Sequence, residues 1–508
     1  MSTSSDGGST SSGMGGDMGA PNGTACVDGD ACRSGLCADE VCCDAVCDGT
    51  CESCALSGAE GACTPQADGE DPENECGIAS CNGASACQVA SALWAMALGD
   101  GPDQSIASVQ IDTKGDVYVA GTFTGSIAFD QDTTLSTAGA DTDIFVAKYA
   151  ATGSLIWARQ YGNASNQSVT HMVVGPRVFI GGIYQGTATF TVASLPFSDR
   201  SSWYVAALNT GDGLGTWANG MADNQSSTFL NRNNLLAIAH TGSRFYTVTS
   251  YGSLLTDFEY TLRRYPVNGG TQEASAIVGG PVSYMTRTQD GGLLLGGSFS
   301  TGFNVLGGPS LSTSGGTDGW IARVSSGLTA SWATSMGGSG AEVVRGLTEL
   351  DNEELVAVGT HTADFTAGAA TVMNAGQQDA FAVRLSSSGS VLDGVGFGGT
   401  GDDAFTAVAA GTDHVVITGT SNGPLDIGGP LNAGGGDDAV VVKLSASDLS
   451  VLWARRAGLL LDQTPRGVAV DGLDRIYVAG TLEMDMTLGG LMLESHGNQD
   501  GFIYQLTP

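Results

Sequence analysis

The chain has 508 residues, of which 53 are acidic and 19 basic, so its formal charge at neutral pH is −34. Such a surface repels phosphate backbones and anionic lipids, which excludes nucleic acids and acidic membrane surfaces as expected partners. No stretch has the 18 or more consecutive apolar residues of a membrane-spanning helix, so we expect no transmembrane segment.

Three regions of different composition follow one another. Residues 1–25 are mostly Ser, Gly, Thr, Asp, Met and Ala, and we expect a flexible tether there. Residues 26–87 contain all twelve cysteines, and residues 88–508 contain all seven tryptophans. Met1 leads directly into polar residues without a signal peptide, yet the cysteines indicate an oxidising compartment. We therefore expect an export signal upstream of this sequence, and a location outside the cell or at its surface.

The second region, residues 26–87, has too few large apolar residues to fold around a hydrophobic core, so cross-links must stabilise it. The cysteines are Cys26, Cys32, Cys37, Cys42, Cys43, Cys47, Cys51, Cys54, Cys63, Cys76, Cys81 and Cys87. Their even number predicts six disulfides of undetermined connectivity. Cys42 and Cys43 should bridge outward to two partners, because a vicinal disulfide strains the peptide. The alternative is structural zinc, since Cys51 and Cys54 have zinc-knuckle spacing, but no histidine lies in the segment and we expect no metal.

The cysteine run has a recognisable pattern: C-R-S-G-L-C from Cys32, then V-C-C, then C-D-G-T-C-E-S-C ending at Cys54. It resembles the cysteine-rich segments near the N-termini of exported proteins from gliding soil bacteria. The resemblance implies a surface protein held by a Ser/Gly tether, with a lipid-anchored cysteine supplied by an upstream segment.

Seven copies of one pattern, each close to sixty residues, extend from about residue 92 to the last residue. The marker is an apolar strand that ends in Trp-Ala and is followed by glycine. Five copies have the tryptophan, at Trp94, Trp157, Trp217, Trp332 and Trp453, and two replace it with Ala274 and Asp393. A fixed period of this size in strand-like segments predicts a radial or solenoidal β-array.

Each copy contains four strand-like segments. In the first complete copy they are Ser105–Asp112, Asp116–Phe123, Asp143–Tyr149 and Ser154–Tyr161, which are rich in β-branched and aromatic residues and separated by turns. Four strands joined in this way predict one antiparallel blade.

The two ends of the array predict how it closes. The last copy ends after its third strand, Asp500–Leu506, whereas the Trp strand Leu93–Leu98 stands alone before the first complete copy. The N-terminal strand can therefore complete the last blade and remove an exposed sheet edge. We predict an all-β fold: a seven-bladed β-propeller of four-stranded antiparallel blades over residues 88–508, with an open β-solenoid as the alternative.

The recurring motifs D-x-F-V-A-K-L, a Trp strand, Gly-Gly and D-x-x-Y-V-A-G-T resemble the seven-bladed propeller repeat of bacterial surface proteins. The resemblance spans the array to its end. It implies the architecture and a surface location, and it carries no common enzymatic activity.

Polar residues recur in the loops that lead into the innermost strand of each blade. These loops share one face with the long connections between second and third strands, so we predict a ligand-binding ring for a polyol, a peptide backbone or a cation at the channel mouth. The ring consists of Asp103, Gln104, Asn166, Gln167, Asn224, Gln225, Glu342, Asp402, Asp403, Asp462 and Gln463. The structural alternative is that these side chains tie off backbone groups where the strands begin. Calcium is the one cofactor that the ring could bind; otherwise we expect none.

Two further rows of residues have structural interpretations. The third strands carry Lys148, Arg263, Arg323, Arg384 and Lys443. We expect each to pair with a carboxylate, although a cationic ring for an anionic ligand is the alternative. The Trp strands also resemble those of quinoprotein dehydrogenase propellers, in which the recurrent tryptophan docks blades together, so we expect packing rather than a quinone site.

The five histidines, His171, His240, His361, His414 and His496, are scattered without paired spacing and predict neither a metal nor a nucleophile–base site. The sequence therefore favours an exported, monomeric, non-catalytic binding or scaffold protein that presents a propeller face to a protein or glycan at the cell surface. The alternative is an extracellular carbohydrate-active hydrolase or lyase that uses carboxylates such as Asp402 and Asp403 at the channel mouth. A structural surface-layer component is a third interpretation.

Overall fold

The computed structural model describes residues 20–27, 32–34, 36–38, 40–45, 47, 52–55, 60–65, 91–99, 101, 103–137, 139–163, 165–220, 231–253, 256–427, 430–431, 435–458 and 461–508. The chain divides into two compact units, Met1–Gln88 and Val89–Pro508. Among the described residues, no helix combines the length and the apolar character needed to cross a membrane.

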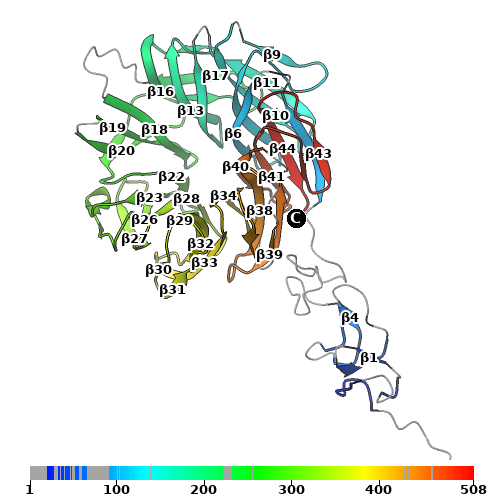
Figure 1. The fold of residues 1–508 in the computed structure, drawn as a ribbon. Helices are drawn as coiled ribbons and strands as arrows, with labels where there is room; N and C mark the ends of the chain where they lie inside the picture. Colours follow the sequence, from blue (N-terminus) through cyan, green and yellow to red (C-terminus); the bar gives the residue numbers. More distant parts are fainter. Residues whose placement is uncertain are drawn as a thin grey trace, which may run out of the picture. The chain divides into compact units, whose positions relative to one another are not determined.

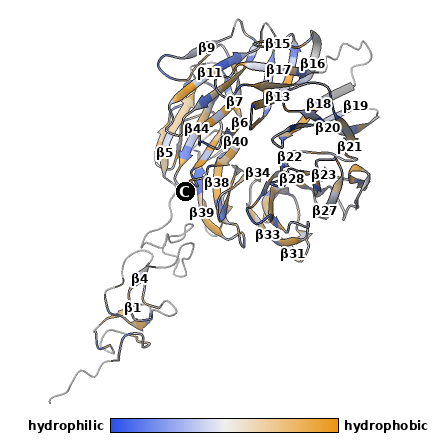
Figure 2. Cartoon of the chain, turned by 180° about the vertical axis from the view of Figure 1, so that it is seen from behind, coloured by the Kyte–Doolittle hydropathy of each residue, from blue (hydrophilic) through white to orange (hydrophobic). Residues whose placement is uncertain are grey.

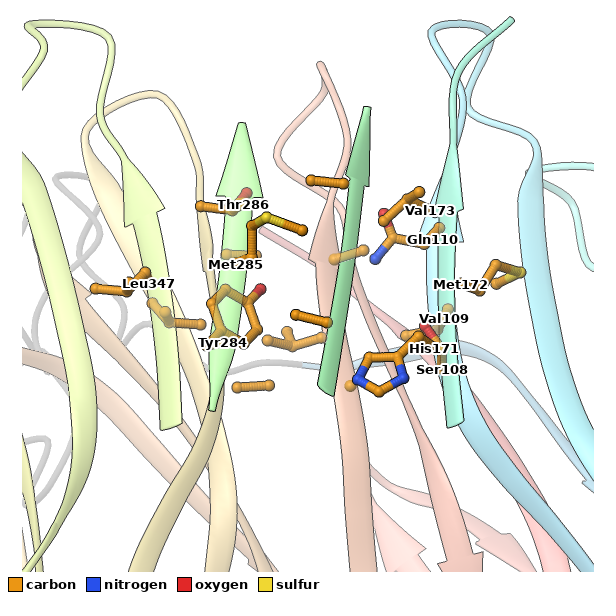
Figure 3. Close-up of a pocket in the computed structure, with 18 of the residues that line it drawn as sticks. Ser108, Val109, Gln110, His171, Met172, Val173, Tyr284, Met285, Thr286 and Leu347 are labelled. Carbon is orange, nitrogen blue, oxygen red and sulfur yellow. The ribbon is translucent and has the colours of Figure 1, made fainter. Parts of the chain in front are cut away.

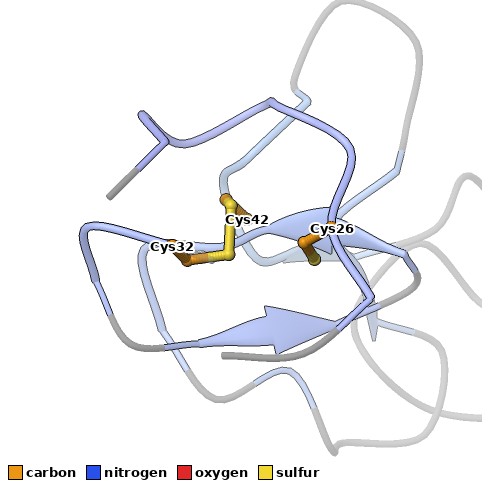
Figure 4. A group of neighbouring side chains, drawn as sticks. All are labelled: Cys26, Cys32 and Cys42. Carbon is orange, nitrogen blue, oxygen red and sulfur yellow. A yellow bond between two sulfur atoms is a disulfide. The ribbon is translucent and has the colours of Figure 1, made fainter. Parts of the chain in front are cut away.

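Disulfides hold the first unit. Its strands are only two residues long and pair as β1 (Cys37–Ala38) with β2 (Val41–Cys42) and β3 (Glu52–Ser53) with β4 (Thr64–Pro65). The bridges are Cys26–Cys37, Cys32–Cys42, Cys43–Cys54 and Cys47–Cys63. The adjacent cysteines thus bridge outward to different partners, as predicted; Figure 4 shows the Cys32–Cys42 bond.

Eight of the twelve predicted disulfide cysteines are therefore placed, and all eight are oxidised. The two sulfur clusters of this unit, Cys26/Cys32/Cys42 and Cys43/Cys47/Cys54, consist of such disulfide sulfurs rather than free thiolates. The other four predicted cysteines, Cys51, Cys76, Cys81 and Cys87, lie outside the described residues.

The second unit is a seven-bladed β-propeller whose described strands form seven antiparallel four-stranded blades (Figure 1). From the centre outward, blade 1 consists of β6 (Gln104–Ile111), β7 (Val117–Thr124), β10 (Thr142–Tyr149) and β11 (Leu155–Tyr161), and blade 2 of β12 (Gln167–Val174), β13 (Val178–Gly186), β16 (Ser198–Leu208) and β17 (Gly215–Gly220). Blade 3 consists of β18 (Asn231–His240), β19 (Arg244–Ser253), β20 (Thr256–Pro266) and β21 (Ala274–Ile277). Blade 4 consists of β22 (Tyr284–Arg287), β23 (Leu293–Phe299), β26 (Asp318–Val324) and β27 (Ala330–Gly338). Blade 5 consists of β28 (Glu342–Glu349), β29 (Leu355–His361), β32 (Asp379–Leu385) and β33 (Val391–Gly399). Blade 6 consists of β34 (Asp403–Ala410), β35 (His414–Ser421), β38 (Asp438–Ser445) and β39 (Val451–Ala457). Blade 7 consists of β40 (Gln463–Val470), β41 (Ile476–Leu482), β44 (Asp500–Leu506) and β5 (Ala92–Leu98).

The ring closes as predicted, by exchange of the N-terminal strand. Strand β5 pairs antiparallel with β44 and so supplies the outermost strand of blade 7, with Leu98 opposite Gly501 and Trp94 opposite Gln505. The pairing covers an edge that would otherwise be free to pair with another chain.

Short hairpins lie between the second and third strands of every blade except blade 3: β8 (Ser126–Ala128) with β9 (Thr134–Ser136), β14 (Thr189–Phe190) with β15 (Ala193–Ser194), β24 (Phe303–Asn304) with β25 (Ser310–Leu311), β30 (Phe365–Ala367) with β31 (Ala370–Val372), β36 (Leu425–Asp426) with β37 (Pro430–Leu431), and β42 (Met486–Leu488) with β43 (Leu491–Leu493). A single 3-10 turn, η2 (Val305–Gly307), follows β24. Strand β30 also pairs with β27 of the preceding blade, and β36 pairs with β33. The hairpins of blades 5 and 6 therefore join each of these blades to the preceding one by backbone hydrogen bonds.

Apolar side chains fill the spaces between blades. The second and third strands are the most buried: every residue of β29, β41 and β44 is inaccessible to solvent or nearly so. In Figure 2, apolar residues run along strands such as β5 and β38. Burial of both faces explains why these segments are continuous apolar runs rather than alternating ones.

Four of the five recurrent tryptophans dock their blade onto the next through an indole hydrogen bond; the fifth, Trp453, is buried without such a bond to a described residue. The indole Nε1 atoms of Trp94, Trp157, Trp217 and Trp332 donate to the carbonyl oxygens of Ala151, Thr210, Val267 and Ser387, at 3.1, 3.3, 3.3 and 3.0 Å. Each acceptor lies in the outer turn of the following blade, where a glycine meets the indole ring. A Cβ atom on Gly389 would lie 2.5 Å from Trp332, and Gly389 has φ +85°, so this position needs glycine for two reasons.

Ring closure can be tested by two truncations. Removing residues 1–98 deletes β5, exposes the edge of β44 and should lower the melting temperature by on the order of 5–10 °C or produce oligomers. Removing residues 1–87 keeps β5 and should leave the propeller monomeric with its original stability. Thermal denaturation and light scattering measure both outcomes; identical behaviour of the two truncations would rule out closure by β5.

The disulfide count can be tested by mass. With twelve cysteines, six disulfides make the non-reduced chain twelve hydrogen atoms lighter than the fully reduced chain. Alkylation before reduction should label no cysteine, and peptide mapping should recover the Cys32–Cys42 and Cys43–Cys54 bridges. Labelled thiols, or zinc that travels with the purified chain, would contradict the prediction.

Candidate functional site

The structure separates the predicted polar ring into two sets. Five members are buried at the first position of an innermost strand: Gln104, Gln167, Glu342, Asp403 and Gln463. Four members are exposed in the loops just before these strands: Asp103, Asn166, Asp402 and Asp462. Asn224 and Gln225 lie outside the described residues.

The buried members belong to a repeated joint between blades. Each lies next to an aspartate at the start of the third strand of the preceding blade, and the pairs are Gln104 with Asp500, Gln167 with Asp143, Glu342 with Asp318, Asp403 with Asp379, and Gln463 with Asp438. A glycine after the fourth strand or at its end makes room for them. A Cβ atom on Gly337 would lie 2.4 Å from Oδ1 of Asp318, and one on Gly458 would lie 2.0 Å from Oδ1 of Asp438 and 2.3 Å from Oε1 of Gln463.

Backbone groups use part of the hydrogen-bonding capacity of the joints, which agrees with the structural alternative. At the joint of blades 4 and 5, Ser314 N donates to Oδ2 of Asp318 at 2.5 Å, and Gly338 N donates to Oε2 of Glu342 at 3.0 Å. The other oxygens, Asp318 Oδ1 and Glu342 Oε1, are buried and accept no hydrogen bond from any described residue. The joint of blades 4 and 5 thus pairs two carboxyl groups, whereas the three joints that contain Gln104, Gln167 and Gln463 pair a carboxyl with an amide.

This arrangement changes the acidity of Glu342. Burial raises the pKa of its carboxyl to about 7, although the hydrogen bond from Gly338 opposes the shift; the negative charge of Asp318 adds to it. In the next joint, burial likewise raises the pKa of Asp403, with a smaller contribution from the charge of Asp379. A buried carboxyl beside a second carboxyl favours the protonated form.

Two of the exposed members, Asp402 and Asp462, form an acidic cluster with Asp437 on the loop face of blades 5 to 7. Burial, the charge of Asp462 and the charge of Asp402 raise the pKa of Asp437, while a hydrogen bond with Asn422 opposes the shift. Asp462 Oδ1 accepts a hydrogen bond from Asp437 N at 2.9 Å. Carboxylate and amide oxygens are ligands that calcium takes, and the calcium expectation stays a prediction.

Asp402 and Asp403 do not act as a pair. Asp402 is exposed, whereas Asp403 is buried and its Oδ2 accepts a hydrogen bond from Gly399 N at 2.9 Å. The two carboxyl groups therefore face different environments, because consecutive residues at the start of a strand point in opposite directions.

Most of the cationic row on the third strands is neutralised, as expected. Lys148 lies 2.8 Å from Asp116, Arg323 lies 3.0 Å from Glu349, and Arg384 lies 2.8 Å from Glu354. The other two members make different contacts: Arg263 donates to Thr249 Oγ1, and Lys443 is buried.

The central channel is the feature that the sequence interpretation missed. A cavity of about 560 Å³ is lined by residues of the first strands of all seven blades, and Figure 3 shows part of its wall. Its lining includes Arg287, Arg345 and Arg466, together with Thr406 and His171. One sequence signal marks two of these arginines: each stands three residues after a buried polar member of the ring, Glu342 or Gln463.

No family model matches this chain. Among curated proteins, the regulatory protein FlaEY of Caulobacter vibrioides is 26% identical over 368 residues, which cover 61% of this chain and 38% of that protein. The chain therefore spans less than half the length of this relative.

Solved structures with a related arrangement are distant. The Pan2 WD40 domain of Neurospora crassa aligns with a TM-score of 0.40 at 10% identity, over 78% of this chain and 88% of that one. Trypanosoma rangeli sialidase aligns with a TM-score of 0.30 at 10% identity, over 84% and 57% of the two chains. Likenesses of this size transfer no function.

The acid–acid joint predicts a pH dependence that one substitution removes. The folded-state pKa of Glu342, about 7, exceeds its ordinary value of 4.5. The stabilisation by the protonated carboxyl is therefore fully present at a pH below its ordinary pKa of 4.5. It is lost as the pH rises through the folded-state pKa of about 7. The loss is about 3 kcal/mol at 1.36 kcal/mol per pH unit. Glu342→Gln, which carries the amide found at Gln167 and Gln463, should be more stable than wild type at pH 8 and gain nothing at pH 4.5.

The measurement is urea or thermal unfolding of both chains from pH 4.5 to 8.5. Glu353→Gln, which removes a charge from an exposed turn, is the matched control and should follow the wild-type curve. Parallel curves for Glu342→Gln and wild type would show that Glu342 is ionised in the folded chain throughout.

Proposed function

We propose that this chain is an exported, non-catalytic binding or scaffold protein whose propeller presents one face to a protein or glycan partner at the cell surface. The supporting observation is the closed seven-bladed ring, which gathers the loops before the first strands and the hairpins after the second strands on one face. Propellers with such a face offer many independently variable loops on a rigid ring, a common basis for recognition.

The location rests on the first unit. Four disulfides lie within the 38 residues from Cys26 to Cys63. Because disulfides form and persist in oxidising compartments, they support export. The resemblance to bacterial surface propellers supports attachment to the envelope. Strand exchange covers the edge of β44, which supports a monomer. The name of FlaEY, a regulatory protein, is compatible with binding rather than catalysis.

The loop cluster of Asp402, Asp437 and Asp462 is the part of this face that we propose for the contact. Its charges are exposed or half-buried, and they lie in loops of three adjacent blades. A partner surface that carries basic groups, or a glycan with vicinal hydroxyls that hydrogen-bond to carboxylates, fits this chemistry.

A carbohydrate-active hydrolase or lyase is the second candidate, favoured by one observation. Asp437 has a raised pKa beside two other carboxyl groups, and carboxyls whose environments separate their pKa values can act as acid and base. Such an enzyme would use Asp437 with Asp402 or Asp462, because Glu342 and Asp403 are buried in the joints.

The proposal is tested by capture on the immobilised, oxidised full chain, with cell-envelope fractions and a polysaccharide panel as probes. One saturable partner should be retained, and Asp402→Asn with Asp462→Asn should weaken its binding about tenfold, or about 1.4 kcal/mol. The control is Asp351→Asn, in the exposed turn between β28 and β29 at the opposite face, which should leave binding unchanged. Shortened polysaccharide that depends on Asp437, without a retained partner, would replace the binding function with the enzyme.

A further inference from the structure

Three arginines in the central channel have no counter-ion. Arg287, Arg345 and Arg466 all line the cavity, and none forms an ion pair with a described residue. Among the described lining residues there is no aspartate or glutamate. In a chain with 53 acidic and 19 basic residues, a wall with three arginines and no acid inverts the charge of the rest of the molecule.

The backbone places two of these arginines at equivalent positions. In β28 the ladder shifts between Val344 and Gly346, and in β40 it shifts between Pro465 and Gly467, so Arg345 and Arg466 are the extra residues of two β-bulges. A bulge redirects the side chain of its extra residue. Thr406 is the extra residue of the bulge in β34, the strand between them in the ring. The three side chains therefore occupy one level of the channel on blades 5, 6 and 7.

The surroundings of Arg345 suit a charged ligand. The Nε atom donates to Thr360 Oγ1 at 3.4 Å, and the two terminal nitrogens form no hydrogen bond or ion pair with a described residue. Burial lowers the pKa of this guanidinium, which still remains charged because arginine does not lose its proton in proteins. A partly desolvated cation without a partner gains most from an anion that enters the channel.

The opposite side of the channel, on blades 2 to 4, carries one of the three arginines, Arg287 at the end of β22, and is otherwise lined by uncharged side chains. Blades 2 to 4 contribute His171, Leu236 and Tyr284, and Figure 3 shows the rings of His171 and Tyr284 projecting from β12 and β22 toward the space between these strands. Burial lowers the pKa of His171 to about 4, so this imidazole is uncharged at neutral pH. The Thr406 hydroxyl donates to Thr418 O at 3.2 Å. The side of blades 5 to 7 thus offers the guanidinium donors of Arg345 and Arg466, and the other side offers mainly aromatic and aliphatic contacts.

The size and charge of the molecule restrict the ligand. A cavity of about 560 Å³ is in the range that holds a small molecule, about 300–1,000 Å³. Polyanions are disfavoured, because they would also meet the outer surface of a chain with a net charge of −34. A small molecule with one or two charges avoids this repulsion once it is inside the channel.

We propose that the central channel binds a small organic anion, whose oxyanion group is held by Arg345 and Arg466 and whose apolar body lies against Tyr284 and Leu236. This site is distinct from the loop face in the proposed function and does not depend on it. Carboxylates and phosphates share the recognising chemistry, two acceptor oxygens that match a guanidinium.

Calorimetric titration of the full chain with three probes at constant ionic strength tests the site. Phenyl phosphate and benzoate have the same aromatic body with different oxyanions, and inorganic phosphate has the oxyanion without the body. At least one aromatic probe should bind saturably at one site per chain and more tightly than inorganic phosphate. Arg345→Gln and Arg466→Gln should each weaken it tenfold or more, because each removes a charged hydrogen-bond donor.

Two controls separate the site from nonspecific attraction and from misfolding. Arg159→Gln removes an equal charge from the exposed face of β11, where the guanidinium donates only to Ala158 O at 3.2 Å, and should bind like wild type. Arg345→Lys keeps the charge and should restore part of the affinity. Absence of saturable binding of all three probes by wild type would overturn the site, as would equal losses in the Arg345 and Arg159 variants. Capture of a partner on the loop face should be unaffected by Arg345→Gln, so the two proposals fail separately.

Discussion

The close approach of neighbouring blades at glycine positions is the constraint on which this structure depends. On the outer side of the ring, an indole packs on a glycine of the next blade and donates to its turn, as Trp332 does at Gly389 and Ser387. On the inner side, a glycine leaves room for the carboxyl of one blade beside the polar side chain of the next, as Gly337 does for Asp318 and Glu342. A single blade cannot bury its two faces, so stability comes from these interfaces, which are complete only when β5 closes the ring.

The repeat pattern was enough to predict the fold. Blade number, strand order and closure by the N-terminal strand follow from seven equally spaced copies and from the unmatched strands at the two ends, because each copy can bury its faces only against its neighbours. The paired cysteines could be predicted as disulfides but not connected, since their pairing depends on loop paths that spacing does not fix.

The candidate site was harder to predict, for a physical reason. The polar positions at Glu342 and Gln463 were identified as a ring, but whether such a side chain points to the channel mouth or into a joint depends on the glycine opposite, in another blade. The channel arginines were missed because a bulge adds one residue and breaks the alternation by which strand residues are assigned to faces. Arg345 follows Glu342 by three residues, a spacing that places two side chains on opposite faces of a regular strand, and the bulge between Val344 and Gly346 changes that assignment.

The joints and the channel are parts of one mechanical unit. Glu342 fixes the start of β28 through the hydrogen bond from Gly338, and the bulge that turns Arg345 into the channel follows three residues later. Gln463 and Arg466 repeat the spacing in β40, where Gln463 is buried at the start of the strand and its backbone N donates to Asp437 O at 2.8 Å. The joint holds each strand at its first residue, and the hydrogen-bonded ladder to the second strand holds it after the bulge, so the arginine has a stiff support on both sides. A binding group carried in this way loses little conformational freedom when a ligand arrives. The buried polar joints, which cost desolvation energy, therefore do more than space the blades: they set where the positive charge of the channel lies.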